Sequence, residues 1–261
     1  MRLMITGAAG LLGSELVRLA DHDVVPTYHS APVDGGVRLD VRGRAEVDAV
    51  IQRVRPDAII HTAFKQSDWV TTADGPANLA IAARDTRFVF VSTDALFDGG
   101  PTPYDEDAPP SPITPYGAAK AAAETAVRAF HPNAVIARTS LIVGSAGISE
   151  SEQLTHDLAG GAPGALFTEN IRCPVDVTDL ALALLELTTS DHRGVAHVGG
   201  PEAVSRLELG QLIAIRDGLD PESLPSSPGP VSHIRLDSTR TQLMLKTRLR
   251  PVREFLRPPR S

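Results

Sequence analysis

The sequence predicts an α/β fold, in which a doubly wound parallel sheet carries a small C-terminal lobe. Three observations predict it. Short apolar strands alternate with helical segments through the first half of the chain, the first strand runs through a glycine-rich turn into a helix, and the alternation loosens beyond Ser140. Regular alternation of strands and helices is typical of a parallel sheet with helices on both faces.

The N-terminal segment is the strongest element of this pattern. Residues 2–6 form an apolar strand, residues 11–20 have a helical pattern, and Gly7, Gly10 and Gly13 lie in and beside the turn between them. Such glycines let the backbone approach a pyrophosphate, which then lies at the positive end of the helix dipole. We therefore expect a Rossmann-type dinucleotide site at this turn.

The next elements follow the same order. Strands are expected over residues 23–27, 58–61, 87–92 and 134–139, because each is a short apolar run. Helices are expected over 47–54, over the alanine-rich 74–84, and from Tyr116 onward. The stretch between residues 97 and 115 contains six prolines, which indicates an extended surface loop.

The second half is expected to divide between two domains. A helix over residues 176–189 and a strand over 194–198 return to the sheet, whereas a strand over 165–168 and helices over 205–217, 236–245 and 252–256 do not. We assign 1–140 and 173–198 to a dinucleotide-binding domain, and 141–172 and 199–261 to a substrate lobe. That lobe is expected at the carboxyl edge of the sheet, where such sheets bind ligands.

Composition excludes several classes of function. The net charge of −7 over 261 residues argues against binding of nucleic acid or anionic membranes. No apolar run is long enough to span a membrane, and the lone Cys173, which we expect to have a packing role, cannot form an internal disulfide. The histidines lack metal-ligand spacing, so no metal site is expected. A cytoplasmic location follows from this reading.

Three residues provide the elements of a proton-transfer site. Tyr116 and Lys120 are four residues apart and share one helix face. An ammonium beside a phenol favours the phenolate, so Lys120 is expected to lower the pKa of Tyr116 and to fit it for proton transfer with a carbonyl or alcohol oxygen. Thr93, at the end of an apolar run, is placed to hydrogen-bond the same oxygen.

Together, these motifs resemble the extended short-chain dehydrogenase/reductase superfamily, and within it the dTDP-4-dehydrorhamnose reductases and related nucleotide-sugar 4-ketoreductases. The segment from Ser92 to Gly99 is similar to that family's Ser-Thr-Asp-Tyr-Val-Phe-Asp-Gly. The segments 178–181 and 247–256 also match in type and order. The resemblance covers nearly the whole chain.

This resemblance implies an NAD(P)H-dependent reductase of a nucleotide-activated keto-sugar. Thr93, Tyr116 and Lys120 carry over as the catalytic residues. The resemblance also implies cofactor contacts at Gly7, Ala9, Gly10, Leu11, Leu12, Gly13, Ser30, Asp40, Val41, Thr62, Ala63, Phe64, Ser92, Tyr116, Lys120, Arg138, Thr139 and Ser140. Among these, Asp40 and Val41 match an adenine-contacting pair, and residues 138–140 match a segment near the nicotinamide carboxamide.

The choice of cofactor depends on the end of the second strand. Residues 26–30 contain no acid that would hold a ribose 2′-hydroxyl and repel a 2′-phosphate. This favours NADP(H) over NAD(H), with Ser30, His29 or Arg38 as donors to the phosphate. The alternative is that these three are ordinary loop residues.

Several features leave the substrate and the role open. The substrate diphosphate needs cationic donors, for which Arg172, Arg206, Arg235 and Arg240 are candidates. Compared with the family, the chain is shorter, has Ala95 in place of a tyrosine, lacks an asparagine around residues 71–72 and carries Trp69 in an altered segment. These departures allow an alternative from another class, a non-catalytic regulatory subunit that binds NAD(P). A homodimer also remains open.

Overall fold

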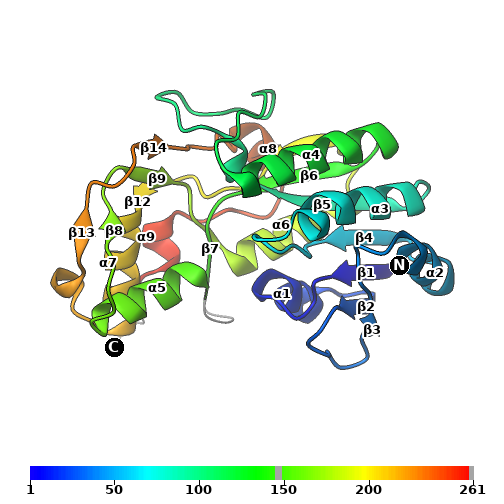
Figure 1. Ribbon diagram of the computed structural model, residues 1–261, viewed down its shortest axis with the longest axis horizontal. Coiled ribbons are helices and arrows are strands. Elements are labelled where there is room, and N and C mark those ends of the chain that lie inside the picture. Colours follow the sequence, from blue (N-terminus) through cyan, green and yellow to red (C-terminus); the bar gives the residue numbers. More distant parts are fainter. Residues whose placement is uncertain (145–148, 259–261) are drawn as a thin grey trace.

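The computed structural model describes residues 1–144 and 149–258, and its central element is a seven-stranded sheet (Figure 1). The strands of this sheet are β1 (Arg2–Thr6), β2 (Asp23–Tyr28), β3 (Val37–Arg38), β4 (Ala58–His61), β5 (Arg87–Thr93), β6 (Val135–Thr139) and β11 (Gly194–His197). The helices around it are α1 (Leu11–Leu19), α2 (Arg44–Val54), α3 (Gly75–Ala82), α4 (Pro115–Phe130) and α6 (Val177–Thr189).

The strand order defines where this sheet can bind a ligand. The order is β11-β6-β5-β4-β1-β2-β3, and every neighbouring pair is parallel. The chain winds outward in one direction from β1 to β3 and in the other from β4 to β11. The order therefore reverses between β1 and β4, and this is the point at which open α/β sheets bind ligands. The predicted doubly wound parallel sheet is confirmed.

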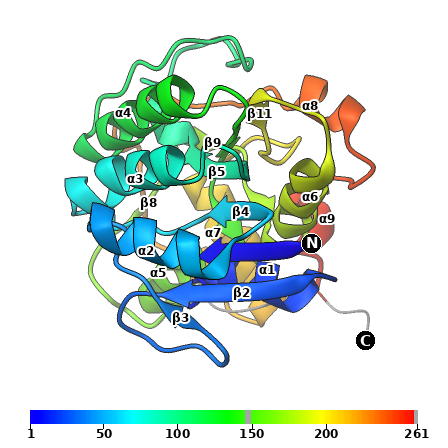
Figure 2. The ribbon, with the colours of Figure 1, turned by 90° about the vertical axis from the view of Figure 1, so that its right-hand side faces the viewer.

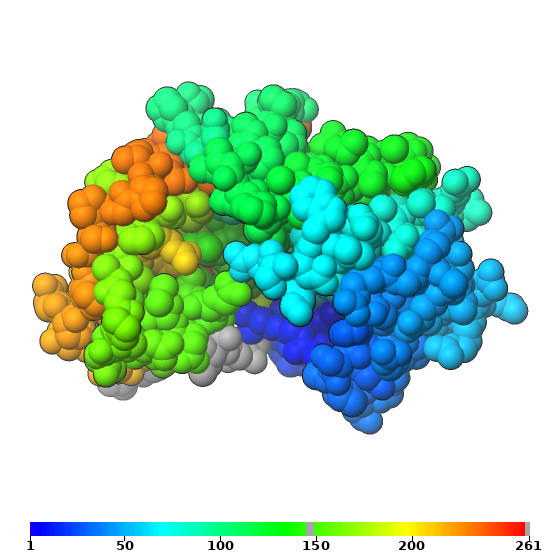
Figure 3. Space-filling model, viewed as in Figure 1, coloured from blue at the N-terminus to red at the C-terminus, as the bar shows by residue number. Residues whose placement is uncertain are grey.

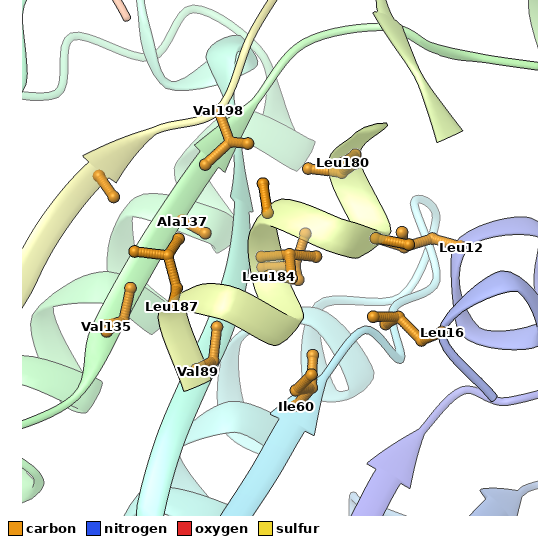
Figure 4. Close-up of a cluster of buried hydrophobic side chains, with 14 of the residues drawn as sticks. Leu12, Leu16, Ile60, Val89, Val135, Ala137, Leu180, Leu184, Leu187 and Val198 are labelled. Carbon is orange, nitrogen blue, oxygen red and sulfur yellow. The ribbon is translucent and has the colours of Figure 1, made fainter. Parts of the chain in front are cut away.

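Two apolar clusters hold the helices to the two faces of the sheet. On one face, Leu12 and Leu16 of α1 and Leu184 and Leu187 of α6 pack against Ile60 and its neighbours (Figure 4). On the other face, α2, α3 and α4 cover a second cluster (Figure 2). The strands β1, β4, β5 and β6 are buried on both faces, which explains why they read as continuous apolar runs rather than as alternating ones.

The remaining elements form a lobe beyond the carboxyl edge of the sheet, on the left of Figure 1. They are α5 (Glu150–Ala159), α7 (Arg206–Asp217), α9 (Val252–Phe255), η3 (Pro221–Ser223), β8 (Leu166–Phe167), β9 (Asn170–Arg172), β12 (Val204–Ser205), β13 (Ser226–Ser227) and β14 (Ser232–His233). Linking elements are η2 (Asp94–Leu96), β7 (Ile142–Val143), β10 (Val175–Asp176) and α8 (Thr239–Met244). β12, β9 and β14 form a small sheet apart from the central one.

Some boundaries differ from the expected ones. The helix expected over residues 74–84 is preceded by a π-helical turn, η1 (Val70–Asp74), and the regular helix α3 begins at Gly75. The helix expected over 236–245 covers only Thr239–Met244. No helix of the described residues has both the length and the apolar character that would be needed to cross a membrane.

Candidate functional site

A groove of about 430 Å³ opens at the switch point of the sheet, beyond the carboxyl ends of β1, β2 and β4. Figure 3 shows the surface hollowed between the lobe and the cyan segment that follows β4. The groove is lined by Thr6, Gly7, Ala9, Gly10, Thr27, Tyr28, His29, Ser30, Ala31, Leu39, Asp40, Val41, Arg42, Thr62, Ala63, Phe64, Lys65, Asp68 and Thr71. Its place in the fold is that of a dinucleotide site.

The glycine-rich turn forms the inner wall of this groove and has no room for larger residues at Gly7 and Gly13. Gly7 has φ +72°, and a Cβ added there would lie 2.9 Å from the backbone of Ala63. A Cβ on Gly13 would lie only 2.1 Å from the carbonyl oxygen of Gly7, so α1 packs directly on the turn. Helix α1 has no side-chain cap and no acidic residue in its first turn. Its first N–H groups thus remain available to an anion, and the turn fits a pyrophosphate.

Half of the predicted cofactor contacts lie in the wall of the groove. They are Gly7, Ala9, Gly10, Ser30, Asp40, Val41, Thr62, Ala63 and Phe64. Asp40 differs from the expectation in one respect, because Arg42 donates to both of its carboxylate oxygens at 2.7–3.1 Å. This pairing lowers the pKa of Asp40 to about 2 and leaves fewer of its lone pairs for an adenine.

The other predicted contacts have partners inside the protein. Leu12 packs in the core between α1 and the sheet. The Ser92 hydroxyl donates to Glu124, the Thr139 hydroxyl to the carbonyl of Val198, and the Ser140 hydroxyl to Asp94 at 2.6 Å. The protons of these hydroxyl groups are therefore already engaged within the protein, and the roles of these residues toward a cofactor stay predictions.

Arg138 has the most extensive of these internal contacts. Its side chain is 1% exposed and makes two hydrogen bonds of 2.9–3.0 Å to the carboxylate of Glu124, which is 2% exposed. A third bond joins it to the carbonyl of Ala108, and the guanidinium lies over the ring of Phe97. The guanidinium is thus committed to holding α4 against β6, and it is not free to contact a nicotinamide.

Tyr116 lies beside the groove, at the start of α4. Thr114 caps this helix by accepting a hydrogen bond from the backbone of Gly117. The ring of Tyr116 packs at a tilt against Phe64, a residue of the groove wall, with centroids 5.8 Å apart. Burial raises the pKa of Tyr116 to about 12, although the nearby Thr93 side chain acts in the opposite direction. The structure therefore brings Thr93 and Tyr116 together next to Phe64.

Lys120 lies one turn further along α4, where its side chain is almost fully buried. Its Nζ donates to the carbonyl of Val91 at 2.9 Å and lies over the rings of Phe64 and Phe90. Burial lowers the pKa of Lys120 to about 7, against the charge of Glu124. The expected lowering of the pKa of Tyr116 is not found in this arrangement, because burial of the phenol dominates and the amine is directed at a backbone carbonyl.

A pH-dependent stability follows from this buried amine. An unfolded lysine titrates near 10.5, whereas Lys120 titrates near 7 in the folded chain, so between these values the unfolded state binds more protons. The destabilising contribution of the lysine should therefore shrink as pH rises from about 7 to about 10.5. In urea unfolding, the free energy of unfolding of wild type should therefore rise relative to that of Lys120→Met between these two pH values. A difference between the two proteins that does not change with pH would contradict the lowered pKa of Lys120.

Comparison with known proteins gives the family to which this geometry belongs. Residues 1–241 match the family described as RmlD substrate binding domain. The chain belongs to this family. A probable low-salt glycan biosynthesis reductase of Haloferax volcanii is 31% identical over 251 residues, covering 87% of this chain and 84% of that protein. The dTDP-4-dehydrorhamnose reductase of Mycobacterium tuberculosis H37Rv is 30% identical over 243 residues, covering 85% and 77%.

A solved structure agrees with this membership of the RmlD substrate binding domain family. The dTDP-4-dehydrorhamnose reductase of Bacillus anthracis, determined in complex with NADP, superposes with a TM-score of 0.84. It is 25% identical and covers 98% of this chain, while 96% of that chain is covered. The fold expected from the resemblance and the family it pointed to are thereby confirmed.

Within this RmlD-family fold, the lobe brings charged residues toward Tyr116. Burial lowers the pKa of Arg206, and the positive charge of Arg172 acts in the same direction. The negative charges of Asp94 and Glu150 act to raise the pKa of both Arg206 and Tyr116, so both carboxylates lie near both side chains. Nε of Arg172 lies 3.7 Å from the Asp94 carboxylate, and among the described residues no ion pair or side-chain hydrogen bond engages the guanidinium of Arg206.

The other two candidate arginines are committed elsewhere in this family member. Arg235 donates to the carbonyl of Pro101. Arg240, which is half exposed, is paired with the buried Glu106 and the exposed Asp107. Among the residues that the structure describes, no group of three His, Cys, Asp or Glu side chains could hold a metal ion.

Sequence reasoning missed the outer wall of the groove. Arg42, Lys65, Asp68 and Thr71 line it but belong to no motif. Arg42 follows the two-residue strand β3, and the others follow β4, so each comes shortly after the carboxyl end of a parallel strand. That position is the only signal in the sequence that could have indicated them.

Proposed function

We propose that this chain is an NAD(P)H-dependent reductase of a nucleotide-activated keto-sugar, acting at a ketone of the kind that dTDP-4-dehydrorhamnose reductases are named for. The observation that carries the proposal is the juxtaposition of Thr93, Tyr116 and Lys120 at the end of a dinucleotide-type groove. Membership of the RmlD substrate binding domain family and relatives named as keto-sugar reductases support it.

The side chains present suit the reduction direction. When bound, the reduced nicotinamide supplies a hydride. A phenol with its pKa raised to about 12 remains protonated at neutral pH, so Tyr116 can give a proton to the oxygen that becomes an alcohol. Thr93 is placed to hydrogen-bond that oxygen. Lys120, with its amine between Val91 and the two phenylalanine rings, holds positive charge near the phenol when protonated.

We also propose that NADPH is the preferred cofactor. Residues 26–30 at the end of β2 offer His29 and Ser30 to the groove and no carboxylate. A relative of this fold carries NADP in its solved structure. Because a 2′-phosphate is strongly anionic, the absence of an acid at this strand end favours it.

Arg206 is the residue that we propose for the substrate diphosphate. It lies in the lobe near Tyr116, and burial lowers its pKa, so that a doubly charged anion would stabilise its charged form. Arg206→Ala should raise KM for a nucleotide sugar by about tenfold or more and leave NADPH affinity unchanged. Arg240→Ala is the matched control, because the half-exposed Arg240 is already paired with Glu106 and Asp107. Equal KM values for the two variants would contradict this role.

The experiment that tests the proposed function is a screen of dTDP- and UDP-linked keto-sugars for oxidation of NADPH. We expect at least one dTDP-4-keto-6-deoxy sugar to be reduced. A non-catalytic subunit, the alternative that the sequence leaves open, would bind the dinucleotide without oxidising it in the presence of any sugar. If the chain bound NADPH but oxidised it with none of the sugars, the proposed function would be wrong and the non-catalytic alternative would take its place.

A further inference from the structure

Arg42 is a cationic residue at the outer end of the groove, and it belongs to no sequence motif. The wall is formed there by His29 and Ser30, which follow β2, and by the turn from Asp40 to Arg42, which follows β3. Nη2 of Arg42 lies 3.5 Å from Nε2 of His29, so the guanidinium reaches across to the end of β2. In doubly wound folds, this strand end meets the adenosine ribose of a bound dinucleotide.

The position of Arg42 is fixed by several contacts. Its Nε and Nη2 both donate to the carboxylate of Asp40, and its backbone N–H donates to Oδ1 of the same residue at 3.0 Å. The side chain of Asn78 donates to the carbonyls of Val41 and Arg42 and thereby ties the turn to α3. The side chain is nevertheless 42% exposed, so it can meet a ligand in the groove without first being released from the core.

The remaining hydrogen-bonding capacity of Arg42 suits a phosphate. A guanidinium has five N–H groups in a fork that matches phosphate oxygens, and Asp40 engages only one side of it. Nη1 lies 3.8 Å from Asp68, a distance too long for a hydrogen bond. His29, half exposed beside it, and the Ser30 hydroxyl can add further donors.

We propose that Arg42, with His29 beside it, forms the subsite for the 2′-phosphate of NADPH and is the residue that sets the preference for NADPH over NADH. This inference rests on the proposed function only in requiring that the groove binds a nicotinamide dinucleotide. It assigns the discrimination to the turn after β3, whereas the loop after β2 contains no arginine. Asp40 then serves to position the guanidinium.

The test is a titration of each variant with NADPH and with NADH in the absence of sugar, followed by the fluorescence of Trp69, the single tryptophan. Arg42→Gln should lower the affinity for NADPH by about tenfold or more and leave that for NADH nearly unchanged. Arg44→Ala is the matched control, because Arg44 is paired with Asp48 and does not line the groove. It should retain the wild-type ratio of the two affinities.

A second variant removes an ambiguity in the first. Arg42→Gln leaves the Asp40 carboxylate without its partner, and that carboxylate would itself repel a phosphate. The double variant Asp40→Asn with Arg42→Gln removes both charges, and we expect it to lack the preference as well. Recovery of the preference in the double variant would contradict the proposal, because it would assign the effect to Asp40.

The remaining outcomes separate this inference from the proposed function. Equal losses of NADPH and NADH affinity in Arg42→Gln would overturn the inference alone, since they would place Arg42 against a part common to both cofactors. A wild-type chain that binds neither cofactor would overturn the proposed function and this inference together. If Arg42→Gln kept the wild-type preference for NADPH over NADH, Arg42 would not bind the 2′-phosphate and the inference would be wrong.

Discussion

Replacement of Tyr116 by phenylalanine is expected to lower the turnover number by at least about 100-fold, the lower end of what a positioned general acid contributes. The substitution removes the hydroxyl and keeps the ring that packs against Phe64. The wall of the groove and the affinity for NADPH should therefore stay intact. Steady-state kinetics with a keto-sugar and a cofactor titration of the same preparation would measure the two effects separately.

Tyr104→Phe provides the matched control for this substitution. The Tyr104 hydroxyl is committed to Asp98 and to backbone N–H groups of the proline-rich loop, and it lies outside the groove. We expect turnover close to that of wild type in this variant. If Tyr116→Phe also turned over substrate at the wild-type rate, the phenol would not be the proton donor, and the assignment of the site would be wrong.

Loss of Arg138 is expected to have the largest effect on stability. Arg138→Ala leaves the carboxylate of Glu124 buried without its main partner, and breaking a buried ion pair in this way costs about 3–5 kcal/mol. Arg128 also lies 3.3 Å from Glu124, but it is half exposed, so Arg128→Ala should cost less than about 1 kcal/mol. Urea unfolding gives the free energy of unfolding of both variants, and it thus compares the loss of a buried partner of Glu124 with the loss of an exposed one.

A double variant tests whether the cost comes from the stranded charge. Glu124→Leu combined with Arg138→Met replaces the pair by apolar groups and should recover much of the stability lost in Arg138→Ala. If Arg138→Ala were no more destabilising than Arg128→Ala, the pair would not be holding α4 against β6 as its contacts indicate.

The parts of the fold that could be predicted from the sequence are those encoded locally. The strand, turn and helix that contain Gly7 and Gly13 follow from short-range pattern, and so does the helix on which Tyr116 and Lys120 share a face. The alternation of elements and the handedness of their connections predict a parallel, doubly wound sheet, whereas the strand order is given by the structure. Ligand binding at the β1/β4 reversal then follows from that order.

The parts that could not be predicted depend on long-range packing. Arg138 and Glu124 are 14 residues apart, and nothing local indicates that their side chains are buried against each other. Arg42 follows a strand of two residues and enters the groove only because β3 pairs with β2. The raised pKa of Tyr116 results from burial, so the expected effect of Lys120, inferred from helical spacing alone, was wrong for this arrangement.

The most direct test of the proposed reduction follows the hydride itself. NADPH that carries deuterium at the transferable position of the nicotinamide would be incubated with the wild-type chain and a dTDP-4-keto-6-deoxy sugar, and the product would be examined by mass spectrometry and NMR. The proposed function predicts one deuterium per product molecule, located at C4 of the sugar, and none with Tyr116→Phe on the same timescale. A product that forms without deuterium at C4, or no product with any keto-sugar, would contradict it.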